Sequence, residues 1–235
     1  MQEPSSLRTA FLQLHVAVFL AGLTAILGKL ISINEIWLVW YRLLITVISL
    51  WILYGWLGKI KRIPIRELGS IILVGAVVAV HWVTFYGSIK YANVSIALVS
   101  FSLLGFFSSL TQPLIMRKRL DWTELLLGLI SVGGVALIFH FDTRYKTGIL
   151  LGVLSAFLAA LFTVLNKRLL AKHSAETVTL FELSGGFAVL SVGMVLMSFG
   201  SHLTWVLPSS TDWIWLLILS WLCTVWAFFL SLQAL

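Results

Sequence analysis

Long apolar runs alternate with short polar connections along the whole chain of 235 residues. Each run is about 20 residues long, which is the length that an α-helix needs to cross the hydrocarbon core of a bilayer. There are eight such runs, at residues 10–31, 35–57, 68–88, 93–115, 122–139, 148–166, 178–199 and 213–235. The pattern predicts an all-α polytopic membrane protein, because no connection is long enough to form a soluble domain.

Positive charge is distributed unequally between the two predicted faces. Arg8 and the connections near 57–67, 116–121 and 167–173 carry 11 of the 16 lysine and arginine residues, and Lys29, Lys90, Arg144 and Lys146 lie on the other face. Short cytoplasmic loops of membrane proteins carry the excess of positive charge. We therefore expect a multi-pass protein of the inner (plasma) membrane with its N-terminus in the cytoplasm.

The composition excludes several classes of protein. The chain is 60% hydrophobic and 11% charged, with a mean hydropathy of +1.04, whereas about a quarter of a soluble domain is charged. The net charge of +7 does not indicate a nucleic-acid partner, because it is divided among short loops. The one cysteine, Cys223, cannot form an internal disulfide, and neither a phosphate-binding G-x-x-x-x-G-K-[ST] nor a zinc-binding H-E-x-x-H motif occurs. We expect no catalytic residue, no metal, no cofactor and no enzymatic activity.

A weak internal repeat relates the two ends of the sequence. Tyr41-Arg42 in the second run corresponds to Phe181-Glu182 in the seventh, and Trp82 in the third corresponds to Trp226 in the eighth. Five runs separate the copies, so the copies would have opposite topology, as the inverted repeats of secondary transporters do. The alternative is chance similarity between apolar helices. The repeat predicts a five-helix first half at 1–140 and an incomplete, three-helix second half at 141–235.

The repeat also predicts a longer protein. Completing the second half needs two more helices, or about 50 residues beyond Leu235. We therefore expect a ten-helix protein of which these residues are a truncated form. Alternating access needs both halves, so we expect the 235 residues alone not to transport.

Three passages carry a resemblance to a known family. They are VWYRLLI around Arg42, the stretch FYGSIKYANVSIALVSFSLLGFFSSLTQPLI that ends near Pro113, and TELLLGLISVGGVALIF with its spaced glycines. Together with the charged turn at 117–119, they resemble the EamA-type branch of the drug/metabolite transporter superfamily. That resemblance implies ten helices, two inverted five-helix repeats and a cytoplasmic N-terminus. The chain departs from the family at Gln112, where a glutamate is frequent, and at Lys118, near which an acidic residue is frequent.

Two charged residues inside apolar runs are candidates for function, because charge within a membrane helix is costly and usually functional. Arg42 could bind a substrate carboxylate, pair with an acid or helix-end carbonyls, or extend to the membrane surface. Glu182 could couple transport to protons, bind a substrate amine, or reach water at the cytoplasmic face. As equivalent residues of opposite sign, Arg42 and Glu182 could bind an amphoteric substrate or form a gating salt bridge.

Four further residues are weaker candidates. His81 in the third run could contact a proton or a substrate, or it could be a neutral histidine bonded to a neighbouring helix. Trp82, Tyr86 and Trp226 could line a cavity for flat or apolar substrates, although aromatic residues of membrane helices more often pack or face lipid.

These features favour a secondary transporter in the lipid bilayer that exports small-molecule substrates, amino acids or related metabolites, by alternating access. Proton coupling is one expectation, and the small residues of the fourth and fifth runs provide either tight packing or the face of a homodimer. The alternatives are an assembly or receptor subunit without transport and a lipid-modifying membrane enzyme. The enzyme would need a catalytic cluster, and the subunit a large loop or soluble domain.

Overall fold

The computed structural model describes residues 4–139, 143–200 and 204–227. Helices joined by short loops make up this part of the chain. They are α1 (Pro4–Leu30), α2 (Glu35–Trp56), α3 (Ile65–Tyr91), α4 (Val94–Phe101), α5 (Leu104–Met116), α6 (Trp122–Phe139), the 3-10 turn η1 (Thr143–Tyr145), α7 (Lys146–Leu170), α8 (Ala175–Gly200), α9 (Ser210–Ser220) and the π-helix η2 (Trp221–Trp226).

The predicted all-α polytopic membrane fold is confirmed. Six helical segments of the described residues are long and apolar enough to cross a membrane, namely Glu35–Trp56, Ile65–Tyr91, Val94–Met116, Trp122–Phe139, Lys146–Leu170 and Ala175–Phe199. Val18–Leu30 and Ser210–Trp226 are shorter apolar helices, so a helix corresponds to each of the eight apolar runs. Residues 228–235 of the last run lie outside the described residues.

The fourth run forms one span that is interrupted between α4 and α5. The Ser102 hydroxyl donates to the Val99 carbonyl at 2.6 Å, and the Leu103 N–H donates to the Ser100 carbonyl, three residues back, at 3.1 Å. Serine hydroxyls compete in this way with the regular bonds of a helix. The span therefore tightens for one turn before α5 continues it.

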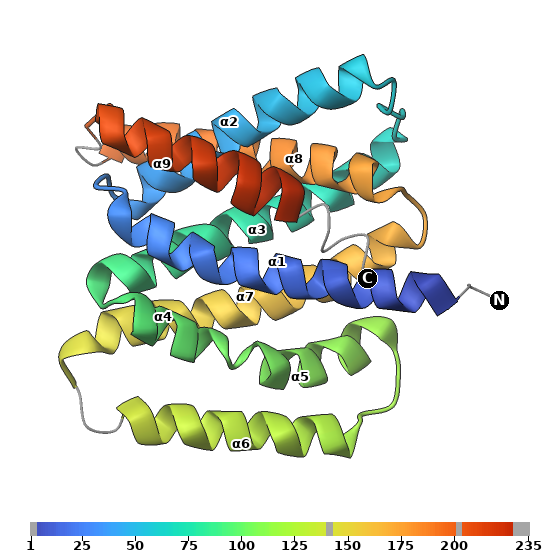
Figure 1. The fold of residues 1–235 in the computed structure, drawn as a ribbon, viewed down its shortest axis with the longest axis vertical. Helices are drawn as coiled ribbons and strands as arrows, with labels where there is room; N and C mark the ends of the chain where they lie inside the picture. Colours follow the sequence, from blue (N-terminus) through green and yellow to red (C-terminus); the bar gives the residue numbers. More distant parts are fainter. Residues whose placement is uncertain (1–3, 140–142, 201–203, 228–235) are drawn as a thin grey trace.

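The helices lie side by side, and their connections alternate between the two ends of the bundle (Figure 1). One end, which we call the basic end, holds the start of α1 and the loops 57–64, 117–121 and 171–174. Helix α3 lies at the centre, where it packs against α7 and α8, and α2 packs against α8 and α9. Helix α6 packs against α5 at the edge of the bundle.

Side-chain caps fix the helix starts at the opposite end. Asn34 accepts the Trp37 N–H at 3.0 Å to start α2, and Asn93 starts α4 in the same way. A capping box of Ser209 and Asp212 starts α9. Asp212 also accepts the Ser32 N–H at 2.6 Å and the Ser32 hydroxyl at 2.7 Å, so the α1–α2 loop is attached to α9.

Glycines bring the backbones of α3 and α8 into direct contact. A Cβ added at Gly75 would clash with the Glu182 carbonyl oxygen, and one added at Gly186 would clash with the Gly75 carbonyl oxygen. Small residues allow this close approach of membrane helices. The approach fixes the depth at which α8, and with it Glu182, lies beside the central helix.

Candidate substrate-binding site

Arg42 lies at the centre of a polar cluster inside the bundle. It is the eighth residue of α2, about 10 Å from the start of the helix at 1.5 Å per residue, and it is 2% exposed. Its Nε donates to the Thr224 hydroxyl at 2.7 Å, its Nη1 to the Tyr86 hydroxyl at 2.6 Å and its Nη2 to the Cys223 carbonyl at 3.4 Å. Helices α2 and α3 and the π-helix η2 therefore meet at this one side chain.

Aromatic rings of α3 enclose the guanidinium. The Arg42 Cζ lies 3.8 Å from the centre of the Trp82 ring and 5.7 Å from that of Tyr86. Cation–π contacts of this kind strengthen when they are removed from water. Both rings are buried, so Trp82 and Tyr86 close the site in this structure.

The π-helix presents Thr224 toward Arg42. The Thr224 hydroxyl donates to the Leu219 carbonyl, five residues back, at 2.9 Å while it accepts from Arg42. The Ser220 hydroxyl donates to the Arg42 carbonyl at 3.3 Å. Single π-helical turns are rare and occur frequently at functional sites, so this turn is consistent with a site at Arg42.

Arg42 has no counter-charge in the part of the chain that the structure describes. Its three partners are hydroxyl and carbonyl oxygens, all neutral, and the ion pairs of Lys59 with Glu176 and of Lys172 with Glu67 lie at the basic end. A buried charge is normally paired with an opposite one. The cluster is therefore suited to an anionic ligand.

His81 forms a second polar contact further along α3. Its Nδ1 lies 2.9 Å from the Ser155 carbonyl oxygen and 3.0 Å from the Ser155 hydroxyl of α7. The rings of Phe85, Phe101 and Phe162 surround it. This geometry corresponds to the interpretation of His81 as a histidine bonded to a neighbouring helix.

Arg42 and Glu182 do not form a salt bridge. Glu182 is fully buried, and its Oε1 accepts from the Asn166 Nδ2 at 3.1 Å. It is the eighth residue of α8, which begins at Ala175 near the basic end, whereas α2 begins at the opposite end. The two residues therefore lie in opposite halves of the bundle, each about 10 Å from the start of its helix.

The structure thus brings together three of the six candidate residues, Arg42, Trp82 and Tyr86. Trp226 lies at the end of η2 with 51% of its surface exposed, and it is not among the contacts of Arg42. Sequence reasoning missed Thr224 and the Cys223 carbonyl. No sequence signal identifies them, because a threonine in an apolar run is unremarkable and a backbone carbonyl is invisible in a sequence.

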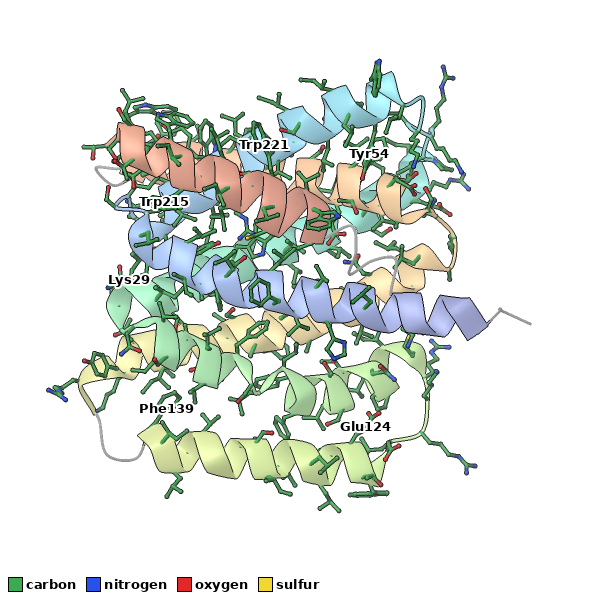
Figure 2. The ribbon with its side chains drawn as sticks, viewed as in Figure 1. Lys29, Tyr54, Glu124, Phe139, Trp215 and Trp221 are labelled. Atoms are coloured by element: carbon green, nitrogen blue, oxygen red, sulfur yellow. The ribbon has the colours of Figure 1, made fainter. Side chains whose placement is uncertain are left out.

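A separate cavity of about 500 Å³ lies at the end of the bundle opposite the basic end. Lys29, Asn93, Ser95, Phe139 and Tyr145 are among the residues that line it, and Figure 2 shows Lys29 and Phe139 at this end of the bundle. None of the six candidate residues lines this cavity, so it does not reach the Arg42 cluster.

Comparison with known proteins agrees with this architecture. Residues 8–140 match the EamA-like transporter family. An uncharacterized transporter of Haemophilus influenzae is 25% identical over 182 residues, a match that covers 73% of this chain and 60% of that protein. A solved crystal structure with 18% sequence identity superimposes with a TM-score of 0.68 over 99% of this chain and 79% of that one. The match thus spans less than two thirds of the transporter's length.

Proposed function

Because the chain belongs to the EamA-like transporter family, we propose that it is a secondary transporter that exports amino acids or related small metabolites by alternating access. Arg42 binds the carboxylate of the substrate. The observation that supports this role is the burial of Arg42 among neutral acceptors, without a protein carboxylate beside it.

A carboxylate is a better partner for Arg42 than the groups it now contacts. Hydrogen bonds between an arginine and a carboxylate are charge-assisted and frequently bidentate, and they are about twice as strong as neutral ones. Tyr86 and Thr224 each offer one hydroxyl oxygen. A substrate carboxylate that replaced these contacts would neutralise the charge and keep the guanidinium bonded.

The rings around Arg42 suit the remainder of such a substrate. Trp82 and Tyr86 would move aside as the site opens and would then contact the carbon skeleton of a metabolite. Binding sites for small molecules are mostly apolar, with a few polar groups that fix orientation.

The positions of Arg42 and Glu182 also support the proposal of two inverted repeats, at 1–140 and 141–235. Each residue is the eighth of its helix, and the two helices start at opposite ends of the bundle. Inverted repeats place equivalent residues in this antiparallel way. The loops of the basic end carry the excess of positive charge, which favours a cytoplasmic location for that end.

Metabolite profiling of the growth medium tests the function. Cells that express the full-length gene should accumulate an extracellular amino acid or related carboxylate, and Arg42→Gln should lower the export rate by about tenfold to a hundredfold, the effect of losing a hydrogen bond to a charged group. Arg62→Gln is the matched control, because Arg62 is exposed in the loop between α2 and α3.

Two results of this metabolite profiling would contradict the proposal. If no metabolite rises although the protein is present in the membrane, export is wrong. If a metabolite rises equally with Arg42→Gln and with the control variant, the protein exports, but Arg42 does not bind the substrate.

A further inference from the structure

Glu182 lies in a closed environment between three helices. Its exposed fraction is 0%, and its backbone carbonyl packs against Gly75 of α3. Its carboxyl group points to Asn166 of α7. A carboxyl group so far from water is stable only if it is neutral or if its charge is well compensated.

No charge compensates an ionised Glu182 within the described residues. Helices α2, α3 and α7 pack against α8, and the carboxyl group has one hydrogen-bond partner, the Asn166 amide. The chargeable side chains toward the same end of these helices do not interact with it; they are Tyr54, Arg66, Glu67, Lys167, Arg168 and, on α8 itself, Glu176. Arg42 and His81, which lie further from the basic end, do not interact with it either.

The hydrogen bonding of the pair is incomplete. The second carboxyl oxygen of Glu182, Oε2, and the amide oxygen of Asn166, Oδ1, are both buried and lack a hydrogen-bond partner. Buried polar atoms of this kind usually have a partner, so each exception calls for an explanation. The pair therefore holds an oxygen that can carry a proton, Oε2 of Glu182, and an oxygen that can accept a hydrogen bond, Oδ1 of Asn166, and both lack a partner.

Asn166 can serve both protonation states of Glu182. Its Nδ2 donates to Oε1 of Glu182, and an ionised carboxylate can accept this bond. After a half-turn of the amide group, Oδ1 would take the same position and accept the O–H of a protonated carboxyl group. The two orientations of an asparagine amide have almost the same shape. The pair can therefore gain or lose one proton without a change in packing.

We propose that Glu182, positioned by Asn166, is the proton-binding site that couples transport to a proton gradient. This inference rests on the proposed transport function and adds its coupling ion. In each cycle the Glu182 carboxylate binds one proton from the water on one side of the membrane and releases it to the water on the other side. No other bond is formed or broken.

Infrared titration tests proton binding without any substrate. The full-length protein in phosphatidylethanolamine–phosphatidylglycerol vesicles should show the carbonyl band of a protonated carboxyl group that disappears as the pH rises. The band should be lost in Glu182→Gln and kept in Glu124→Gln, the control at an exposed glutamate of α6. In Asn166→Leu its midpoint should move by about one pH unit, which corresponds to one hydrogen bond; a merely structural role of Asn166 would leave the midpoint unchanged.

A flux measurement tests the coupling. The same vesicles, loaded with a mixture of the common amino acids, should release them up to about tenfold faster for each unit of pH gradient. Glu182→Gln should keep the release seen without a gradient and lose the acceleration, whereas Glu124→Gln should keep both.

The two measurements separate failure of the coupling from failure of the proposed function. Acceleration that persists in Glu182→Gln, or an infrared band that this variant retains, overturns the coupling role of Glu182. Wild-type vesicles that release no amino acid at any gradient contradict amino-acid export. In that case the infrared band still decides whether Glu182 binds a proton.

Discussion

At the scale of single residues, the hydroxyl of Tyr86 determines how a permanent charge is tolerated inside the bundle. It accepts the shortest of the hydrogen bonds that Arg42 donates, at 2.6 Å, and its own side chain is fully buried. A hydrogen bond to a buried charge contributes more to stability than one between neutral groups, because a buried charge that loses the bond cannot form one with water instead.

Tyr86→Phe should therefore destabilise the protein while it preserves the shape of the core. The expected loss is about 1–2 kcal/mol in the free energy of unfolding, measured by denaturant or thermal unfolding of the purified protein in detergent. Tyr91→Phe is the matched control on the same helix, because Tyr91 is 58% exposed. Equal stabilities of the two variants would mean that Arg42 finds another acceptor, such as a water molecule.

The sequence could indicate the charged residues of the site but not their partners. Arg42 and Glu182 stand out because each interrupts an apolar run. Thr224 and the Cys223 carbonyl lie about 180 residues from Arg42 in the chain, and their contacts depend on how η2 winds and where α9 packs. The absence of a salt bridge between Arg42 and Glu182 follows from helix direction, which places them in opposite halves of the bundle.

At the scale of helices, α3 organises the bundle because it can approach α8 without side chains in between. Gly75 and Gly186 lie at this crossing, together with the backbone of Glu182. Without a hydrophobic force between helices in lipid, such packing contributes much of the association energy. A larger side chain at the crossing must push two backbones apart.

Gly75→Ala should consequently lower the free energy of unfolding by about 1–3 kcal/mol, the usual effect of overpacking, in the same unfolding assay. Gly69→Ala, six residues earlier on α3, should have no such effect, because a Cβ there meets no atom within 4 Å. A destabilisation common to both variants would indicate a general effect of alanine on α3 rather than a clash with α8.

The helices themselves were predictable from hydropathy, since lipid forces the backbone to satisfy its hydrogen bonds within each span and the bilayer sets the length. Helix packing was less predictable. The interruption at Ser102 depends on a local hydroxyl bond, and the crossing at Gly75 depends on shape at a single residue. Neither the interruption nor the crossing can be recognised from the average hydropathy of a run.

At the scale of the whole molecule, ion pairs at the basic end join the two predicted repeats. Lys59, before α3, pairs with Glu176 at 3.0 Å. Glu67, in the first turn of α3, lies 2.7 Å from His173 and 3.7 Å from Lys172, both in the loop between α7 and α8. If the repeats move apart at this end during transport, these contacts must break.

Glu67→Gln should then favour opening at the basic end, and Cys223 can report it. Cys223 is the one cysteine of the 235 residues, it is buried, and its carbonyl contacts Arg42. Partly exposed ion pairs contribute about 0.2–1 kcal/mol, so maleimide labelling of Cys223 in inside-out membrane vesicles should accelerate up to about fivefold. Glu124→Gln is the control, because Glu124 is exposed at the same end (Figure 2). Equal labelling of both variants would show that the basic end opens independently of these ion pairs.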